Sequence, residues 1–489
     1  MHKFRLQVVS IDSMDAYISL LEKDCSEAVI ASLSLTGHQA IELQSRQKIV
    51  TTLVSDLARD EVYSPWSQEA LLQVLQSLKL LSRDYEAAKS LYTTEGIGML
   101  MRHADLLSES YRDSAVIHES LKCLANCLLL ESRTREIFHS LEGEKLLVSK
   151  FQSPSLSNDS QFLFGRILFL STVSSPKVVN ILANNGDFLS AIDEIIGQCI
   201  NSGSEVSLSE FNSVMIISEY LKMLFNMVTN YVPCSDYKDK ADEDEVSKQK
   251  MSLKYSSLIP ILVRVITEIP FKNSAPVSPP HSHAIHVLLN MTISSLEPLW
   301  FQQDSQEPYI LVLTLIEMLK SILNNCFSEE SQSLSDLLAS LDTFFPPLLI
   351  LMNNIAKENL HACSLMKECL LPDNMLDSLR YIYLIFYISN SFFCSDRSKP
   401  LGKGRRFSDS LISLLTTGVL SHTKDTAGEF LFILCDQDSS KFVDRVGYGN
   451  AIGFLTNRGI PFPYPTSYSH GEDDSCPQKY AVNPVTGQY

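Results

Sequence analysis

Two basic residues, Lys79 and Arg83, stand four positions apart in a leucine-rich segment, and they are the first candidates for binding an anionic group. Side chains at positions i and i+4 of a helix lie on the same face. Both positive groups could therefore reach one carboxylate together. The alternative is a solvated helix face, because most surface charges have no binding role. Lys222 and Lys367 are weaker candidates of the same kind.

Several leucine-rich segments end in an asparagine whose side-chain amide could hydrogen-bond the backbone of a partner. The segments are residues 121–126, 221–226, 286–290 and 349–353, and the candidate binding residues in them are Asn126, Asn226 and Asn290. The alternative for each is that the amide fixes a neighbouring loop, because buried amides usually find local partners.

Catalytic alternatives have little support. Residues 447–453 contain three glycines, but a dinucleotide-binding turn must follow a strand, and here a predicted helix precedes it. His281, His283 and His286 lack the cysteine or carboxylate cluster that would complete a metal site. The sequence therefore predicts a protein without covalent chemistry, cofactor or metal ion.

The elements that carry these residues are predicted to be helices. Apolar residues recur at i, i+3, i+4 and i+7 along most of the chain, whereas period-two strand signals are rare. Tandem helices that share one leucine-rich pattern are typical of an armadillo- or HEAT-like solenoid. The intervals between positions 126, 226, 290 and 353 are 100, 64 and 63 residues, so no strict period is present. The predicted fold class is all-α, an armadillo/HEAT-like helical-repeat superhelix.

The polar and proline-rich segments indicate where helices are interrupted. Loops are predicted at residues 153–160, 235–250, 273–283 and 328–335. After Gly459 three prolines and an acidic run replace the helical pattern, which predicts a flexible acidic tail. The predicted organisation is a helical-repeat domain over residues 1–459 and a tail over 460–489 that ends in the Asn-Pro-Val-Thr-Gly motif.

Composition restricts the possible partners and the compartment. The formal net charge of −17 disfavours nucleic acid and anionic membranes as primary ligands. The N-terminus has no long apolar run behind its basic residues, so we expect a cytoplasmic protein. Most of the 11 cysteines lie in apolar helical stretches, which favours buried thiols over a disulfide framework.

The C-terminal part of the chain resembles the synembryn family. The resemblance rests on residues 427–435, 441–443, 447–455 and 483–487, taken in this order behind a helical array. It implies a superhelix whose concave face holds the C-terminal helix of a heterotrimeric G-protein α subunit, so that GDP is released. It also implies a chaperone role toward newly made α subunits. The competing class is a helical-repeat scaffold that binds another helical peptide and affects no nucleotide.

The resemblance also assigns roles to single residues. It implies that Lys79 and Arg83 contact the acidic end of the α-subunit helix, and the matching family segment is basic at both positions. Ser469 follows Tyr468 and precedes an acidic run, as does a regulatory phosphorylation site of the family, whereas the alternative is an unmodified tail. Within residues 374–395 an apolar stretch departs from the family pattern, and the two alternatives for it are an extra buried helix and translated intron sequence kept in frame. Family members continue beyond the point where this chain stops, so α-subunit binding is expected more directly than exchange.

Overall fold

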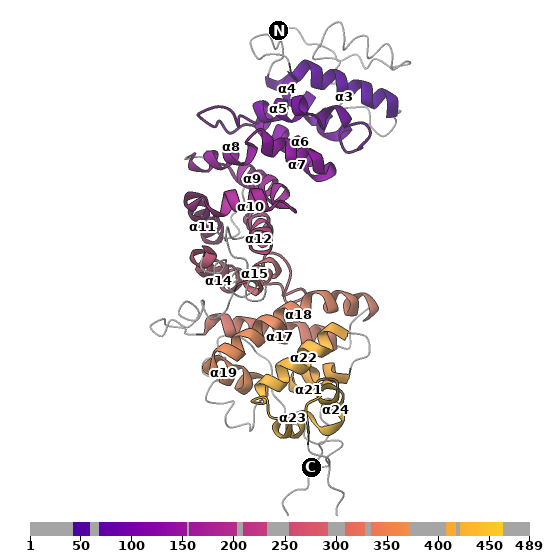
Figure 1. Ribbon diagram of the computed structural model, residues 1–489, viewed down its shortest axis with the longest axis vertical. Helices are drawn as coiled ribbons and strands as arrows, with labels where there is room; N and C mark the ends of the chain where they lie inside the picture. Colours follow the sequence, from indigo (N-terminus) through magenta and orange to yellow (C-terminus); the bar gives the residue numbers. More distant parts are fainter. Residues whose placement is uncertain are drawn as a thin grey trace, which may run out of the picture. The chain divides into compact units, whose positions relative to one another are not determined.

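The described part of the protein is almost entirely helical. The computed structural model describes residues 43–58, 68–153, 156–202, 209–231, 254–291, 309–327, 334–371, 407–416 and 421–462. Among these residues the only β-type pairing is an isolated bridge between Lys272 and Ala275. The predicted all-α fold is thus confirmed, and the helices follow one another as a repeat array (Figure 1). No described helix combines the length and the apolar character needed to cross a bilayer.

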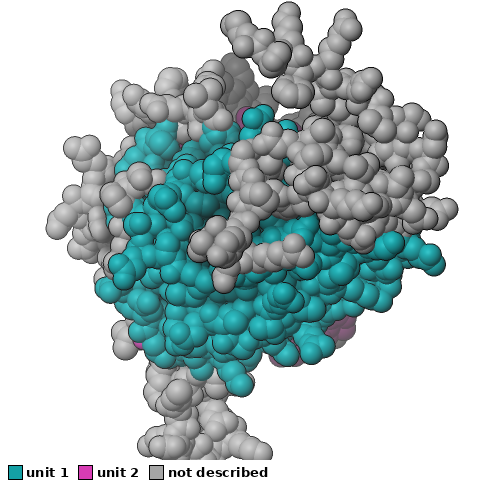
Figure 2. Space-filling view, turned by 90° about the horizontal axis from the view of Figure 1, so that it is seen from above, with its two compact units in different colours: residues 1–236 teal, residues 237–489 magenta. Residues whose placement is uncertain are grey.

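The chain divides into two compact units, Met1–Asp236 and Tyr237–Tyr489, which Figure 2 shows in different colours. The division falls inside the mixed-charge segment 235–250. The helices of the first unit are α3 (Leu43–Ala58), α4 (Gln68–Leu81), η3 (Lys89–Leu91), α5 (Thr94–His103), α6 (Ala115–Leu130), α7 (Ser132–Ser140), α8 (Gly143–Ser149), η4 (Lys150–Gln152), α9 (Asn158–Thr172), α10 (Pro176–Ala183), α11 (Gly186–Asn201) and α12 (Ser213–Asn230).

The second unit carries the C-terminal residues of the family resemblance. Its helices are η5 (Ser256–Leu258), α14 (Ile259–Glu268), α15 (His281–Leu289), α17 (Ile310–Phe327), α18 (Leu334–Glu358), α19 (Leu360–Leu370), α21 (Phe407–Ser413), η7 (Leu414–Thr416), α22 (Ser421–Leu434), α23 (Ser439–Val446) and α24 (Tyr448–Asn457).

In the first unit α4, α6, α9 and α12 pack in succession, each against the next. Their apolar faces form the core; on α6, for example, Leu121, Leu124 and Leu128 are fully buried. Because each helix covers the apolar face of its neighbour, no single repeat could bury its core alone. Four helices of this kind therefore present one continuous inner layer.

Side-chain caps fix where the inner helices begin. Ser114 accepts a hydrogen bond from Ile117 N at the start of α6, and Asn212 does the same from Met215 N at the start of α12. Ser157 caps α9 by accepting from Ser160 N. Such caps satisfy backbone donors that the first helical turn leaves unpaired. The loop predicted at 153–160 is therefore too long, because α9 begins at Asn158.

The glycine-rich segment at 447–453 forms a helix boundary followed by a helix. Gly447, with φ of 85°, ends α23 and begins α24, and this backbone conformation favours glycine. Gly449 and Gly453 lie inside α24. The element directly before Gly447 is the helix α23, so the segment lacks the strand that must precede a dinucleotide-binding turn.

A polar network joins the starts of α6 and α9. Asp113 Oδ2 accepts a hydrogen bond from Ser157 N at 2.7 Å, while its Oδ1 accepts from Ser160 Oγ at 3.1 Å and also contacts His118. Burial alone would raise the pKa of Asp113, but the hydrogen bonds from Ser157 and the His118 ring outweigh it and hold that pKa below its ordinary value. Asp113 thus connects two successive inner helices while it is charged.

Replacement of Asp113 by asparagine should therefore destabilise the protein in a pH-dependent way. Asparagine offers one acceptor oxygen where two are used, so we expect the free energy of unfolding to fall by about 1–2 kcal/mol at neutral pH. A lowered folded-state pKa stabilises above the unfolded-state value, and this contribution is lost as the pH falls through the folded-state value. Urea unfolding at pH 7 and at about pH 2, well below the ordinary pKa of an aspartate, measures both effects. If the variant and the wild type differ in the free energy of unfolding by the same amount at the acidic pH as at pH 7, this account is contradicted.

Candidate partner-binding surface

A buried carboxylate on α6 holds two cations from two helices. Glu119 Oε2 accepts a hydrogen bond from Lys79 Nζ of α4 at 2.5 Å, and its Oε1 accepts one from Lys122 Nζ at 3.0 Å. Lys122 stands three positions after Glu119 and therefore lies on the same face of α6. The three charged groups form what we call the first bracket.

The same arrangement recurs between α9 and α12. Glu219 of α12 accepts from Arg166 Nη1 of α9, with both oxygens at 3.4 Å, and from Lys222 Nζ at 2.5 Å. Close helix packing permits this contact, because a Cβ on Gly165 would lie only 3.2 Å from Glu219 Cβ. The Phe169 ring lies beneath both cations, with its centroid 4.9 Å from Lys222 Nζ and 5.8 Å from the Arg166 guanidinium carbon. This is the second bracket.

An aromatic pair joins the two brackets. Phe211 stacks on Phe162 of α9 with ring centroids 3.8 Å apart, and Lys122 Nζ lies 5.9 Å from the Phe211 centroid. Phe162 stands one helical turn before Arg166 on α9, so the stack leads from one bracket toward the other. Four cations thus follow four successively packed helices. We call this set, Lys79, Lys122, Arg166 and Lys222, the cation row.

The electrostatics of the first bracket favour the charged forms. Burial would raise the pKa of Glu119, but the hydrogen bonds from Lys79 and Lys122 outweigh it and lower the pKa below its ordinary value. Burial would likewise lower the pKa of Lys122, yet Glu210 and Glu119 raise it. Glu119 and Lys122 are therefore both ionised at neutral pH. Glu210, which is mostly exposed, forms a further ion pair with Lys122.

Two of the cations predicted in the first unit are engaged within the protein. Lys79 and Lys222 are neither freely solvated nor unpaired, because each is bound to a buried glutamate. Arg83 does not share a helix with Lys79, since α4 ends at Leu81 and Arg83 follows in the turn. Its exposed side chain makes no hydrogen bond or ion pair with the described part of the chain. Arg83 is thus a cation available to a partner.

The three predicted asparagines differ in what their amides bind. Asn226 donates to Phe169 O at 3.2 Å and to Thr172 Oγ1 at 3.1 Å, so it fixes α12 to α9. Asn290 donates to His286 O within the same turn of chain. The half-buried amide of Asn126 makes no hydrogen bond within the described ranges.

The different behaviour of Asn126 and Asn226 has a simple cause in the neighbouring helices. Phe169 and Thr172 stand three and six positions after Arg166, and α9 continues through both. The same offsets from Lys79 give Ser82 and Tyr85, which lie beyond the end of α4. Because α4 ends early, Asn126 has no equivalent helical surface to bind, and its amide remains available.

Exposed apolar side chains accompany the polar groups. Leu129 and Leu130 stand three and four positions after Asn126 on α6, and both are exposed, Leu129 by 49%. On α12, Phe225 stands three positions after Lys222 and is 37% exposed. Since residues at these spacings share a helix face, the layer presents apolar and cationic groups side by side. An amphipathic helix with acidic residues is complementary to such a surface.

Glu119, Glu219 and Arg166 were not among the sequence candidates, although a signal for the two glutamates exists. Residues 119–126 and 219–226 both follow the pattern Glu-x-Leu-Lys-x-Leu-x-Asn, with the first residues 100 positions apart. The prediction used only the leucine, lysine and asparagine positions. The acid at the start of each pattern, three residues before a lysine, indicates an ion pair.

The remaining candidates lie elsewhere. Asn290 and Lys367 belong to the second unit, where Lys367 pairs with Asp436 at 3.2 Å. Ser469 and the predicted tail after Phe462 fall outside the described residues, as does the apolar stretch within 374–395.

Two other constellations could suggest chemistry but do not support it. His118 Nε2 faces both Asp113 and Ser160, whereas a catalytic triad needs the acid and the serine on opposite ring nitrogens. His281 is buried and its Nε2 lies 2.9 Å from Ile269 O, as expected of a core histidine. Within the described ranges no group of three metal-ligating side chains comes together.

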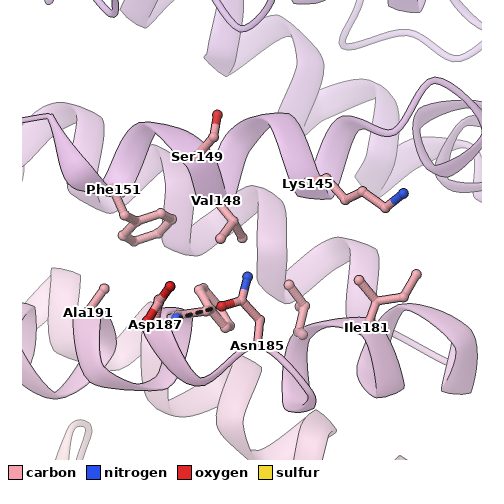
Figure 3. Close-up of a pocket in the computed structure, with 10 residues that line it drawn as sticks. Lys145, Val148, Ser149, Phe151, Ile181, Asn185, Asp187 and Ala191 are labelled. Carbon is pink, nitrogen blue, oxygen red and sulfur yellow. Dashed lines mark hydrogen bonds between the residues drawn. The ribbon is translucent and has the colours of Figure 1, made fainter.

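A cavity of about 360 Å³ lies between the α8–η4 segment and the α10–α11 segment of the first unit. Lys145, Val148, Ser149 and Phe151 approach it from one side, and Ile181, Asn185, Asp187 and Ala191 from the other (Figure 3). Asn185 is occupied as the cap of α11, and Lys145 pairs with Glu142. None of the cavity residues belongs to the four helices of the cation row.

Comparisons with known proteins place the chain in a family. It matches the family described as guanine nucleotide exchange factor synembryn over residues 74–380 and 392–489. The unmatched residues 381–391 fall within the stretch 374–395 that departs from the family pattern. "Chaperone Ric-8A" of Danio rerio is 26% identical over 97% of this chain and 86% of its own length.

Two further relatives extend the range of species. "Chaperone Ric-8A" of Gallus gallus is 25% identical over 91% of this chain and 80% of its own. "Chaperone ric-8" of Caenorhabditis elegans is 22% identical over 85% of this chain and 75% of its own. Since the family match covers both compact units and most of the sequence, this protein is a member of the synembryn family.

Proposed function

We propose that this protein binds the C-terminal helix of a heterotrimeric G-protein α subunit on the α4, α6, α9 and α12 layer. The proposal rests on the cation row and on the exposed Leu129, Leu130 and Phe225 beside it. The last helix of such an α subunit is amphipathic and ends in a carboxylate. Its apolar face would contact the exposed leucines and phenylalanine, and its acidic end would lie near Arg83 and Asn126.

Exchange and chaperone activity follow from one preference and need no covalent chemistry. If the protein binds the nucleotide-free α subunit more tightly than the GDP-bound form, linkage requires that it weakens GDP binding by the same factor. The same preference protects a nucleotide-free α subunit that would otherwise unfold. We therefore propose guanine-nucleotide exchange and folding assistance as two results of one binding event. The cytoplasmic location and a transient presence at the plasma membrane through the client belong to the same proposal.

The second candidate function is a scaffold that binds some other acidic helix. The described surface is compatible with it, because apolar and cationic groups alone do not specify one helix. Asn290, Lys367 and the phosphorylation of Ser469 remain proposals for additional contacts or for regulation. Lys367 would first have to leave Asp436.

The decisive measurement is GDP release from a purified GDP-loaded α subunit. Addition of the protein should increase the release rate in proportion to the amount of complex formed. An α subunit that lacks its C-terminal helix serves as the control and should respond little. If the complete α subunit binds but releases GDP at its intrinsic rate, the scaffold function is correct instead.

Arg83→Glu should weaken binding of a synthetic peptide with the C-terminal sequence of the α subunit without unfolding the protein. Reversal of one exposed, unpaired charge replaces attraction by repulsion, and the loss should be about 1–3 kcal/mol at low salt, roughly five- to 150-fold in Kd. Lys79 is less suitable, because its reversal would break its ion pair with Glu119 and place a second negative charge beside that buried acid. Lys177→Glu, on an exposed face of α10, is the matched control and should leave affinity unchanged. Equal affinities of both variants would argue against this surface.

Asn126 and Asn226 hold equivalent positions in the repeated pattern, but their replacement should have different effects on binding and on stability. Asn126→Ala should weaken peptide binding about five- to tenfold while changing the free energy of unfolding by less than about 0.5 kcal/mol. Asn226→Ala should instead lower the free energy of unfolding by about 1 kcal/mol or more, because it removes two hydrogen bonds between α12 and α9. Isothermal titration and urea unfolding on both variants measure this contrast. Loss of stability in Asn126→Ala with intact binding would show that the amide has a structural role.

A further inference from the structure

The cation row is held in place by two acids that are nearly inaccessible to solvent. Glu119 is 6% exposed and Glu219 is 5% exposed. Each accepts hydrogen bonds from one cation on its own helix and from one cation on the preceding inner helix. The recurrence of the same contacts in both brackets indicates a common role.

A buried carboxylate needs partners, because an unpaired charge inside a protein is costly. The cations need the carboxylates as well. Lysine and arginine side chains have many rotamers, and a free side chain must lose this freedom when it binds a ligand. Bound to a rigid acid, the four side chains of the cation row have already lost it. The brackets therefore preorganise the cations, which lowers the entropic cost of binding a partner.

The charge balance leaves the row attractive to acidic groups. Four cations face two buried glutamates, so the two brackets together carry a net charge of +2. Glu210 pairs with Lys122 from a mostly exposed position and reduces this to +1. Each cation is a multiple donor, and its remaining N–H groups can bind a second acceptor. A partner carboxylate can thus be bound without displacing Glu119 or Glu219.

We propose that Glu119 and Glu219 are positioning residues of the partner-binding surface, which fix the cation row for the acidic side chains or carboxylate end of the partner helix. This inference rests on the proposed function, because it concerns the same surface. It assigns the acids a role in recognition although they share the sign of the ligand.

Replacement of one of these acids by glutamine distinguishes two accounts, because they predict opposite changes in the affinity for an acidic peptide. If only the overall charge attracts the partner, Glu119→Gln or Glu219→Gln makes the surface more positive and must tighten binding of an acidic peptide. If the acids position the cations, either variant releases two side chains from their fixed geometry and must weaken binding. Glutamine keeps the size of the side chain, so packing changes little.

The first experiment measures the affinity of the protein for a synthetic peptide with the C-terminal sequence of the α subunit and for the same peptide with an amidated C-terminus. We expect each glutamine variant to bind the free-acid peptide about tenfold more weakly and to discriminate less between the two peptides. Glu142→Gln is the matched control, because Glu142 pairs with Lys145 outside the four helices of the cation row and its loss changes the net charge equally. Glu119→Asp, which keeps the charge, should restore part of the affinity. Tighter or unchanged binding in both glutamine variants would overturn the proposal.

The second experiment needs no partner. Competitive acetylation followed by mass spectrometry reports how accessible and how protonated each lysine is. Lys79 and Lys122 should become more reactive in Glu119→Gln, and Lys222 in Glu219→Gln, while Lys145 should change only in Glu142→Gln. Unchanged reactivity would overturn the positioning role even if the peptide binds. If the wild-type protein fails to bind the peptide while these reactivities change as expected, the proposed partner is wrong. The acids would still be shown to hold the cations in place.

Discussion

A buried carboxylate shared by cations from two successive helices links neighbouring helices of the α4, α6, α9 and α12 layer. Glu119 and Glu219 are nearly inaccessible to solvent, so each must keep its partners or bear the cost of an unpaired buried charge. The bracket therefore fixes the register of α4 against α6 and of α9 against α12. Hydrophobic packing alone is less specific, since cores tolerate changes in apolar contacts more readily than the loss of a buried ion pair.

Packing and recognition are coupled through this arrangement. Gly165 allows α9 and α12 to approach closely, and this approach brings Arg166 to Glu219 and Asn226 to Phe169. Between α4 and α6 the early end of α4 leaves Asn126 and Arg83 unoccupied. The repeat thus uses the same residue pattern twice, once to close a contact between helices and once to leave polar groups available. The polar groups that remain available lie where the repeat is incomplete.

A protein that binds one state of a partner more tightly than another shifts the partner toward that state. The Ser-His-Asp network has the wrong geometry for acyl transfer, and the cavity near Phe151 belongs to a different layer of helices. Binding free energy alone suffices to shift a nucleotide equilibrium, provided the nucleotide-free form is bound more tightly. Family membership and the cationic, partly apolar layer point to the same mode of action.

Helical periodicity and short local motifs were enough to predict the all-α repeat class and the family, because they are properties of neighbouring residues. They also identified Lys79, Arg83 and the asparagines as candidates, but not what each one binds. Lys79 meets Glu119 across 40 residues and Asn226 meets Phe169 across 57, and such pairings depend on how helices stack. The end of α4 at Leu81 likewise separates Arg83 from the helix face that periodicity predicted. Contacts between helices, unlike the helices themselves, are set by packing that no local pattern encodes.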